Sequence, residues 1–485
     1  MSPPDPVADR RRWIALAVCC SALFMTLLDL SITNVALPAI GVATGAGPAQ
    51  LQWVVSGYTL AFGLVPVLGG RLGDDHGRRS MFIIGVAGFV VTSALSGLAP
   101  SGGVLIAARV LQGLSGGLIN PQVSGLVQQL FSGRDRGRAF GVIGTVVALG
   151  TALGPLVGGL LIAVGGPEFG WRLVFFVNIP IGLAVIVLAR RWLPDAPATG
   201  RHRLDIGGAV VLGLATFCVL FAAVEYDALH DTRLFLLGIP AVVLLIGFFR
   251  REARLTRARL EPLVDLRLFR QPSFTAGVVL ALVFFCGMTG LPLVLALYYQ
   301  QGLGYTAFQS GLGITAFALG SAIAAPLAGR VVTRVGRPLV VGACLTFGAG
   351  ALALDVVARQ NPGNGAAVAF AIPLFFLGLG SGAVITPNQT LTLVDVDPVI
   401  GGTAGGVLQT SQRIGAAIGQ AVIGAAFFAA LPAGAMGLAG TARTDVYDHA
   451  LSQAVLVAVM FIAAALAVGV VDLMLTRRRR ALVSH

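Results

Sequence analysis

Residues 70–79 read Gly-Arg-Leu-Gly-Asp-Asp-His-Gly-Arg-Arg, a short charged segment between two long apolar runs. Gly70 and Gly77 are seven residues apart, and the same spacing returns at Gly329 and Gly336 in the second half of the chain. In both places a basic turn joins one hydrophobic run to the next. Two such copies, one in each half, indicate a duplicated bundle of membrane-spanning helices.

The composition agrees with a chain embedded in a membrane. Of its 485 residues, 56% are hydrophobic and only 11% are charged, whereas a soluble domain carries roughly 25% charged residues. The net charge of +12 would suit a nucleic-acid partner. The arginines, however, lie in short turns between apolar runs and form no basic stripe with interleaved aromatic residues. We therefore expect no nucleic-acid binding.

All 33 basic residues are arginines, and this excludes several classes of chemistry. A Walker A loop and a Schiff-base enzyme both require a lysine, so the chain is neither a self-contained ATP-driven pump nor such an enzyme. The five cysteines lie inside apolar runs, and the five histidines have no partners at metal-ligand spacing. No nucleophile elbow or appended soluble domain is evident either. We expect no catalytic site, metal or cofactor, and the chain is not an enzyme.

Apolar runs long enough to cross a bilayer as a helix, about 20 residues each, occur fourteen times. They cover roughly residues 13–40, 52–72, 81–99, 103–128, 138–163, 172–192, 207–225, 233–250, 274–300, 308–330, 338–358, 366–390, 402–430 and 451–475.

The arginines predict the orientation of these spans. Nearly all of those outside the spans fall in alternate connections, on the side that also carries both termini. Only four fall on the opposite side: Arg172, Arg233, Arg359 and Arg443. Cytoplasmic connections carry the excess of arginine in membrane proteins, so both termini are predicted to lie in the cytoplasm. An even number of spans is then required, and fourteen satisfies this.

The segment from Gly70 to Arg79 resembles motif A of the major facilitator superfamily. Its glycines permit a tight turn and a close approach of helices. The resemblance implies a gating motif made of Gly70, Asp74, Gly77, Arg78 and Arg79, which latches the outward-facing state. Because the second copy has Thr333 at the position of Asp74, we expect the latch to be concentrated in the first half.

A second pattern lies in the fifth predicted span. Gly150, Gly154 and Gly158 recur every fourth residue, which places them in a strip on one helix face where another backbone can approach. Together with Pro155 and Gly159 they resemble motif C, which is associated with antiporters of this superfamily.

Three further segments resemble the subfamily of fourteen-helix drug:proton antiporters, and the resemblance extends over nearly the whole chain. They are the first-span segment Leu28–Pro38, a motif B segment around Arg109, and the segment Trp171–Gly182. The implied fold is all-α, with two six-helix bundles and two additional central helices. The first bundle would comprise residues 1–192 and the second 273–485, and residues 193–272 would hold the two inserted helices and their cytoplasmic linkers.

Asp29 is the only acidic residue well inside an apolar span, and it is the best candidate for proton coupling. Burial raises the pKa of such a carboxylate toward ambient pH, and a nearby arginine lowers it again. Arg109 would be that arginine, because a charge in mid-membrane needs a partner. The alternative is a permanent ion pair that only stabilises the fold. Candidate substrate-binding residues are Asp29, Asn34, Gln112, Gln409 and Arg413.

The function predicted from these patterns is proton-coupled antiport, which exports amphipathic small molecules such as drugs or antibiotics across the cytoplasmic membrane by alternating access. The partners would be the small-molecule substrate, protons and membrane lipids. The proton gradient would replace any cofactor, and a monomer is expected. One alternative is an exporter dedicated to one metabolite or to a self-made antibiotic. A proton-coupled importer with the same fold is less favoured, because the glycine pattern of residues 150–159 is typical of antiporters.

Overall fold

A computed structural model describes residues 6–195, 205–229, 232–258, 260, 262–360, 365–432 and 440–483 of the chain. These residues form helices and connecting turns, with no strand among them. The first half consists of α1 (Pro6–Thr44), α2 (Pro48–Leu64), α3 (Pro66–His76), α4 (Arg78–Gly97), α5 (Gly102–Leu130), α6 (Gly133–Phe176) and α7 (Asn178–Trp192). Then follow α8 (Ile206–Leu229), the 3-10 helix η1 (Thr232–Leu237) and α9 (Gly238–Arg257).

The second half has the same kind of construction. After a short 3-10 turn, η2 (Leu266–Arg270), it consists of α10 (Pro272–Leu297), the π-helical turn η3 (Tyr298–Gly302), α11 (Ala307–Val335), α12 (Arg337–Arg359), α13 (Ala366–Ala369), α14 (Ala371–Thr392), the 3-10 turn η5 (Pro398–Ile400), α15 (Gly401–Ala429) and α16 (Gly440–Val483). Helices occupy all fourteen predicted ranges. Among the described residues, eleven helices are long and apolar enough to cross a membrane, and the bent pair α2–α3 makes twelve. The other two ranges belong to α9 and α15, of which α15 is rich in glycine and carries polar residues.

Two breaks in the helices occur at a proline and at a glycine. The axis bends by 48° between α2 and α3, where Pro66 begins α3. Helix α6 is broken at Gly166, whose φ of 72° lies in the left-handed region that favours glycine. The break separates the fifth span from the sixth, which continues through α7.

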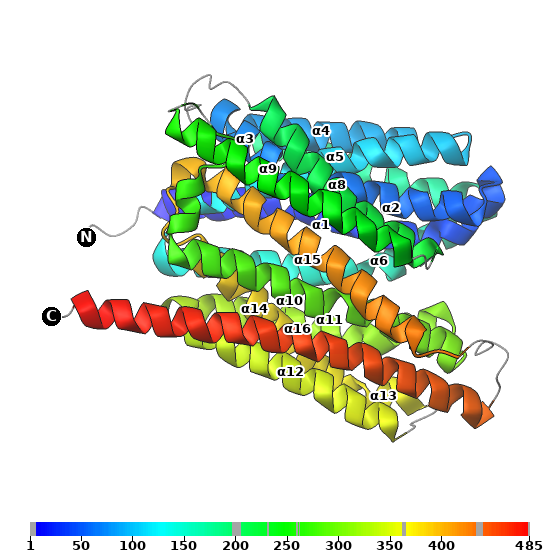
Figure 1. Cartoon of the computed structure of the whole chain (residues 1–485). Helices are drawn as coiled ribbons and strands as arrows, with labels where there is room; N and C mark the ends of the chain where they lie inside the picture. The colour runs from blue at the N-terminus through cyan, green and yellow to red at the C-terminus, as the bar shows by residue number, and fades with distance from the viewer. Residues whose placement is uncertain are drawn as a thin grey trace.

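The two halves contact each other mainly through α3 against α15 and α6 against α11. Helix α1 begins and α16 ends at the same end of the molecule, here called the terminal end (Figure 1). The halves approach each other near this end and diverge toward the opposite end (Figure 1). Glycine makes the approach between α6 and α11 possible, because a side chain on Gly137 or on Gly329 would collide with the backbone of the other.

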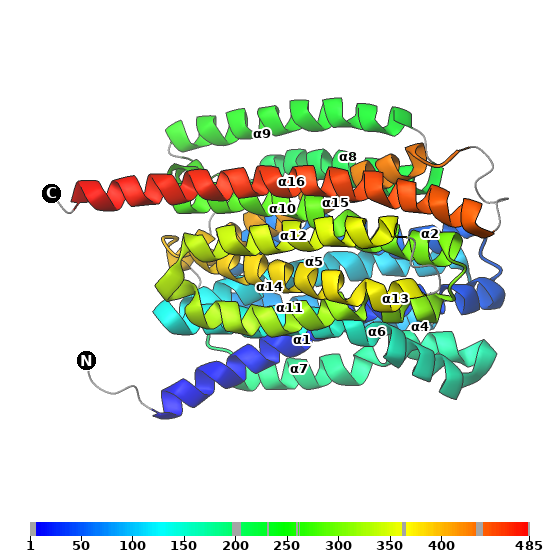
Figure 2. The same ribbon diagram turned by 90° about the horizontal axis from the view of Figure 1, so that it is seen from below.

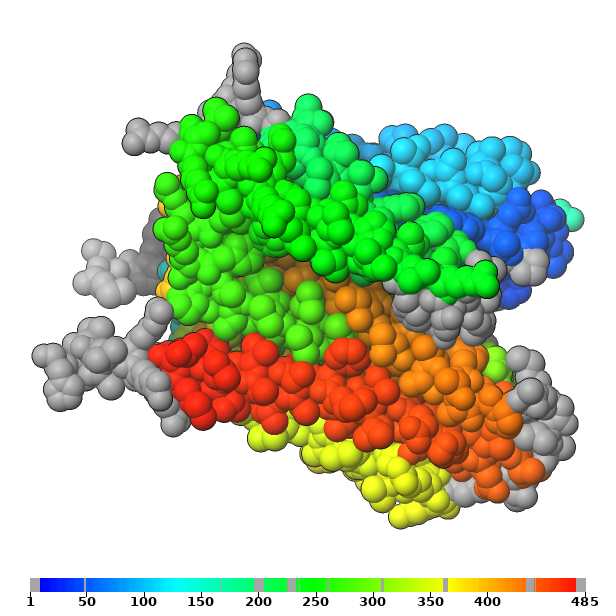
Figure 3. All heavy atoms as spheres, viewed as in Figure 1, coloured from blue at the N-terminus to red at the C-terminus, as the bar shows by residue number. Residues whose placement is uncertain are grey.

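The inserted helices lie on the outside of this arrangement. Helix α8 packs against α2 of the first half and α15 of the second, and α9 packs on α8. Figure 2 places α9 at the outer edge of the molecule, and Figure 3 shows it forming the surface beside α15. Leu220 of α8 contacts this junction together with Leu60 of α2 and Ala417 of α15. The insertion therefore covers one side of the seam between the halves. The predicted boundaries of the bundles, at residues 192 and 273, stay a prediction.

Candidate functional site

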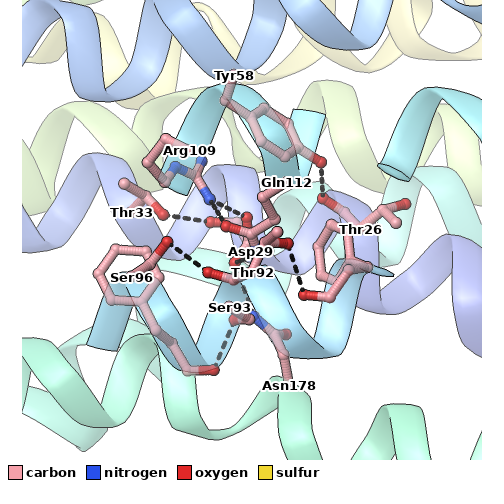
Figure 4. A network of polar contacts seen from close by, with 12 residues as sticks. Thr26, Asp29, Thr33, Tyr58, Thr92, Ser93, Ser96, Arg109, Gln112 and Asn178 are labelled. Atoms are coloured by element: carbon pink, nitrogen blue, oxygen red, sulfur yellow. Dashed lines mark hydrogen bonds and ion pairs between the residues drawn. The ribbon is translucent and has the colours of Figure 1, made fainter. Parts of the chain in front are cut away.

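Asp29 lies in α1 with a completely buried side chain. Arg109 Nη1 of α5 donates a hydrogen bond to Asp29 Oδ2 over 2.5 Å, and Gln112 Nε2 donates to Asp29 Oδ1 over 3.1 Å. Asn178 Nδ2, at the start of α7, donates to the same Oδ1 over 2.7 Å. Figure 4 shows the three donors converging on the carboxylate. Both carboxylate oxygens therefore have partners, and the negative charge is matched by one buried guanidinium.

Arg109 is itself held in place on several sides. Its Nε donates to the backbone oxygen of Val54 over 3.2 Å, and its Nη1 also donates to Gln112 Oε1 over 2.8 Å. The guanidinium carbon lies 4.2 Å from the centre of the Tyr58 ring, a cation–π contact. A charge buried in a membrane protein is tolerated only with such compensation. The pair is thus enclosed within the first half.

The predicted substrate-binding residues separate into different environments. Gln112 belongs to the Asp29 network and is fully buried, whereas Asn34 of α1 is exposed and lies outside it. Asn178 was not among the predicted site residues although it contacts Asp29 directly. The signal for it was present, since it is the only amide in the apolar sequence of α7.

The predicted gating motif lies at the junction of α3 and α15. Asp74 Oδ1 accepts a hydrogen bond from the backbone N–H of Gly402 over 3.0 Å, and its Oδ2 accepts from the backbone N–H and the hydroxyl of Thr403 over 2.7 and 2.8 Å. Helix α15 begins at Gly401. The carboxylate thus lies at a helix N-terminus, where backbone N–H groups lack partners within the helix and the dipole favours a negative charge. A residue of the first half caps a helix of the second.

Arg78 extends the same contact. It donates to Asp74 Oδ1 over 2.7 Å and to the backbone oxygen of Pro398, in the second half, over 2.5 Å. Gly70 lies so close to α15 that a side chain there would collide with the backbone oxygen of Gly402. Arg79 has a different partner, because it pairs over 2.5 Å with Asp195, which follows α7.

Gly77 serves the turn itself, since its φ of 94° lies in the region that favours glycine. In the second copy of the motif, Gly329 approaches Gly137 of the first half. Arg337, at the position of Arg78, instead makes its contacts within the second half. Arg337 pairs with Asp472 of α16 and donates to Asn388 Oδ1 of α14 over 3.2 Å, both within the second half. The expectation that the latch is concentrated in the first half stays a prediction.

Helix α15 also meets α5 and α2. Gln128 Nε2 of α5 donates to the backbone oxygen of Gly401 over 3.1 Å, and Gln409 Nε2 donates to Ser124 Oγ of α5 over 3.1 Å. Further along α15, the guanidinium carbon of Arg413 lies 4.5 Å from the ring centre of Phe62 in α2. The predicted residues Gln409 and Arg413 thus follow one another along a seam between the halves.

The strip of glycines on α6 packs within the first half. A side chain on Gly150, Gly154 or Gly158 would meet Leu27, Ser31 or Ile32 of α1, with the closest conflict at Gly154. A side chain on Gly159 would meet nothing within 4 Å, and Pro155 is exposed. The first three glycines therefore set the approach of α6 to α1, and the other two predicted positions do not.

Among the described residues no cluster of histidine, cysteine, aspartate and glutamate could hold a metal ion. What the structure presents instead is a pair of helical halves with a buried charged network in one of them and a latch between them. This is the architecture of a multi-pass membrane transporter.

Comparison with known proteins supplies the family. The model of the Major Facilitator Superfamily matches residues 19–420, and the chain belongs to this superfamily of transporters. Among solved structures, the human organic anion transporter MFSD10 (TETRAN) has a similar fold. Its TM-score is 0.64 at 15% sequence identity, over 95% of this chain and 100% of that one. This likeness concerns the fold alone.

Several relatives of known sequence match most of the chain. The "Probable actinorhodin transporter" of Streptomyces coelicolor is 37% identical over 93% of this chain and 77% of its own length. The tetracenomycin C resistance and export protein of Streptomyces glaucescens is 34% identical, over 85% and 76%. The multidrug resistance protein Stp of Mycobacterium tuberculosis is 31% identical, over 88% and 78%. All three are named for transport of, or resistance to, antibiotics or drugs.

Proposed function

We propose that this protein exports amphipathic small molecules across the cytoplasmic membrane in exchange for protons, as a monomer and without a cofactor. The names of its relatives support export of drugs or antibiotics. The proton would be carried by Asp29, with Arg109 tuning it, and this assignment rests on a single observation. Asp29 is an acid fully buried inside a membrane-spanning helix, hydrogen-bonded to a buried arginine.

The arginine distribution supports placing the terminal end in the cytoplasm. The contacts of Asp74 and Arg78 with α15 lie near that end, so the structure would represent a state closed toward the cytoplasm. In the proposed cycle, protonation of Asp29 from outside weakens its bond to Arg109 and frees the guanidinium. Deprotonation toward the cytoplasm restores the pair. If Asp29 alone titrates, one proton enters in each cycle.

The experiment must separate a role of Asp29 in proton transfer from a role in stabilising the fold. Removing either Asp29 or Arg109 alone leaves the other as a lone buried charge, which costs roughly 3–5 kcal/mol. Asp29→Asn and Arg109→Gln are therefore compared with the double variant Asp29→Asn/Arg109→Gln, which buries no net charge. Efflux of a dye and the accompanying proton flux are measured in proteoliposomes with an imposed pH gradient.

If Asp29 carries the proton, the double variant folds like the wild type but moves no protons in exchange for dye. Proton-coupled efflux that survives in the double variant would refute the assignment. The direction of the proton flux also separates antiport from import with the same fold.

A second candidate is export of one dedicated compound. The two relatives from Streptomyces are named for single compounds, actinorhodin and tetracenomycin C, and they are 37% and 34% identical to this chain. Testing a deletion strain against a panel of unrelated compounds separates the two functions. Sensitivity to many compounds indicates a multidrug exporter, and sensitivity to one chemical family indicates a dedicated exporter.

A further inference from the structure

Arg413 has an unusual environment for a charge within a membrane-spanning bundle. Helix α15 itself, α2 with the contacting Phe62, and α5, which meets α15 at Ser124, contain no aspartate or glutamate. Among the described residues no carboxylate lies within ion-pair distance of its guanidinium. The guanidinium instead makes a cation–π contact with the ring of Phe62. Helix α8 also approaches, through Leu220, but its Glu225 lies about 7.5 Å further along the helix axis.

Two buried aspartates of the first half are already engaged. Both carboxylate oxygens of Asp29 accept hydrogen bonds, which come from Arg109, Gln112 and Asn178. Asp74 is held by Arg78 and the N-terminus of α15. Neither carboxylate is free to balance Arg413, so the region around it carries an uncompensated positive charge.

The position of Arg413 along α15 places it where a ligand could reach it. From the terminal end, successive contacts close the seam between the halves: Asp74 to Thr403, Ser124 packed against Gly405, and Gln409 to Ser124. Arg413 follows Gln409 by one helical turn. It is the one charged residue of α15, it lies beyond these polar contacts, and its side chain is only partly buried.

The contact with Phe62 leaves the guanidinium able to bind a ligand. The Arg413 guanidinium carbon lies over the face of the ring, and no hydrogen bond from its nitrogens to a described residue is present. A guanidinium stacked on an aromatic ring keeps its N–H donors in its own plane, where they match a carboxylate or a similar anion. The Tyr58 ring lies 5.9 Å from that of Phe62 in a stacked arrangement, so Phe62 is held in place beside Arg413 by a second, buried ring.

We propose that Arg413 and Phe62 form a subsite for the acidic group and adjoining ring of an aromatic anion, so that the transported molecules are anionic aromatics rather than cations. This inference rests on the proposed export function, since it names the charge class of the cargo. A cationic molecule would have to approach an uncompensated arginine and would find no free carboxylate near it.

The test compares two dyes that share a xanthene ring system and differ in charge, anionic fluorescein and cationic rhodamine 123. Binding to the purified full-length chain is measured by fluorescence anisotropy for the wild type, Arg413→Gln and Arg413→Lys. Arg359→Gln is the matched control, because Arg359 is exposed and pairs with Asp355 of its own helix. Monodispersity on size exclusion and thermal melting check that each variant is folded.

We expect the wild type to bind fluorescein at least about tenfold more tightly than rhodamine 123. One hydrogen bond between charged groups contributes enough free energy for a difference of this size. Arg413→Gln should lose about tenfold or more of the fluorescein affinity, Arg413→Lys should recover part of it, and Arg359→Gln should change nothing.

Equal or weaker binding of fluorescein by the wild type, or a folded Arg413→Gln variant with unchanged fluorescein affinity, would overturn the proposal. If Arg413→Gln does not fold, the affinities of the wild type for fluorescein and rhodamine 123 test the proposal on their own. A preference for fluorescein without proton movement in liposomes would support the subsite and contradict only the proton coupling.

Discussion

Asp74 and Thr403 are 329 positions apart in the chain, yet one oxygen of the Asp74 carboxylate accepts hydrogen bonds from both the backbone N–H and the hydroxyl of Thr403. These bonds join the first half to the second near the terminal end, and Arg78 reinforces them through the backbone oxygen of Pro398. The closure between the halves therefore includes a carboxylate at a helix N-terminus in addition to apolar contacts.

Asp74→Ala removes this cap and should weaken the closed state of the terminal end. The loss of hydrogen bonds to a charged group shifts the equilibrium between the two states by about tenfold or more. We expect slower dye efflux and faster hydrogen exchange in residues 401–409. Asp355→Ala, which removes a pair within α12, is the control. Unchanged exchange in 401–409 would show that the cap does not hold the halves together.

Gly70→Ala tests the same junction by steric conflict. The added methyl group would collide with the backbone oxygen of Gly402, so α3 and α15 could not reach their present distance. We expect a folded protein whose efflux is reduced about tenfold or more. Gly342→Ala in α12, where an added methyl group meets nothing within 4 Å, should transport normally. Equal efflux by the two variants would contradict the close approach.

The sequence predicted the helices and the main pairing well, for physical reasons. Apolar length determines the spans, and a buried charge requires a partner, so Asp29 and Arg109 could be matched before any coordinates were known. The contact of Arg413 with Phe62 could not be predicted, because it depends on how α2 and α15 are rotated and tilted against each other. Tilt and rotation are set by neighbouring helices and not by the composition of one span.

The glycines of α6 illustrate the same limit. The spacing of four residues correctly placed Gly150, Gly154 and Gly158 on one face. Gly159 completes the sequence pattern but lies about 100° around the helix from Gly158 and faces no neighbour. A pattern that is read as a whole thus contains positions with different physical roles.

This difference gives a matched pair of substitutions in one helix. Gly154→Ala would bring a methyl group into Ser31 of α1 and should reduce the thermal stability of the purified protein by several degrees, through overpacking of roughly 1–3 kcal/mol. Gly159→Ala should leave the melting temperature unchanged or raise it slightly, because alanine favours helix. Melting curves in the same detergent compare them directly, and equal destabilisation by both would contradict the packing of α6 against α1.

Because of Glu252, we expect the stability of the folded protein to depend on pH. Glu252 lies in α9 beyond the apolar run, is fully buried, and its Oε2 accepts a hydrogen bond from the backbone N–H of Val264 over 3.0 Å. The pKa of Glu252 is raised from its ordinary value of 4.5 to about 7, mainly by burial and also by the neighbouring Asp205. The Val264 N–H and Arg251 act in the opposite direction.

Because the pKa of Glu252 is raised in the folded state, its protonated form is the one that folding favours. The stabilisation is fully present below pH 4.5 and is lost as the pH rises through about 7. We expect the melting temperature of the purified protein to fall between pH 5 and pH 8, by an amount that corresponds to about 1–3 kcal/mol. Glu252→Gln stays neutral at every pH and should flatten this part of the curve. Parallel curves for the wild type and Glu252→Gln would show that this carboxyl group does not titrate between pH 5 and pH 8, whereas a difference that grows with pH would confirm it as the group responsible.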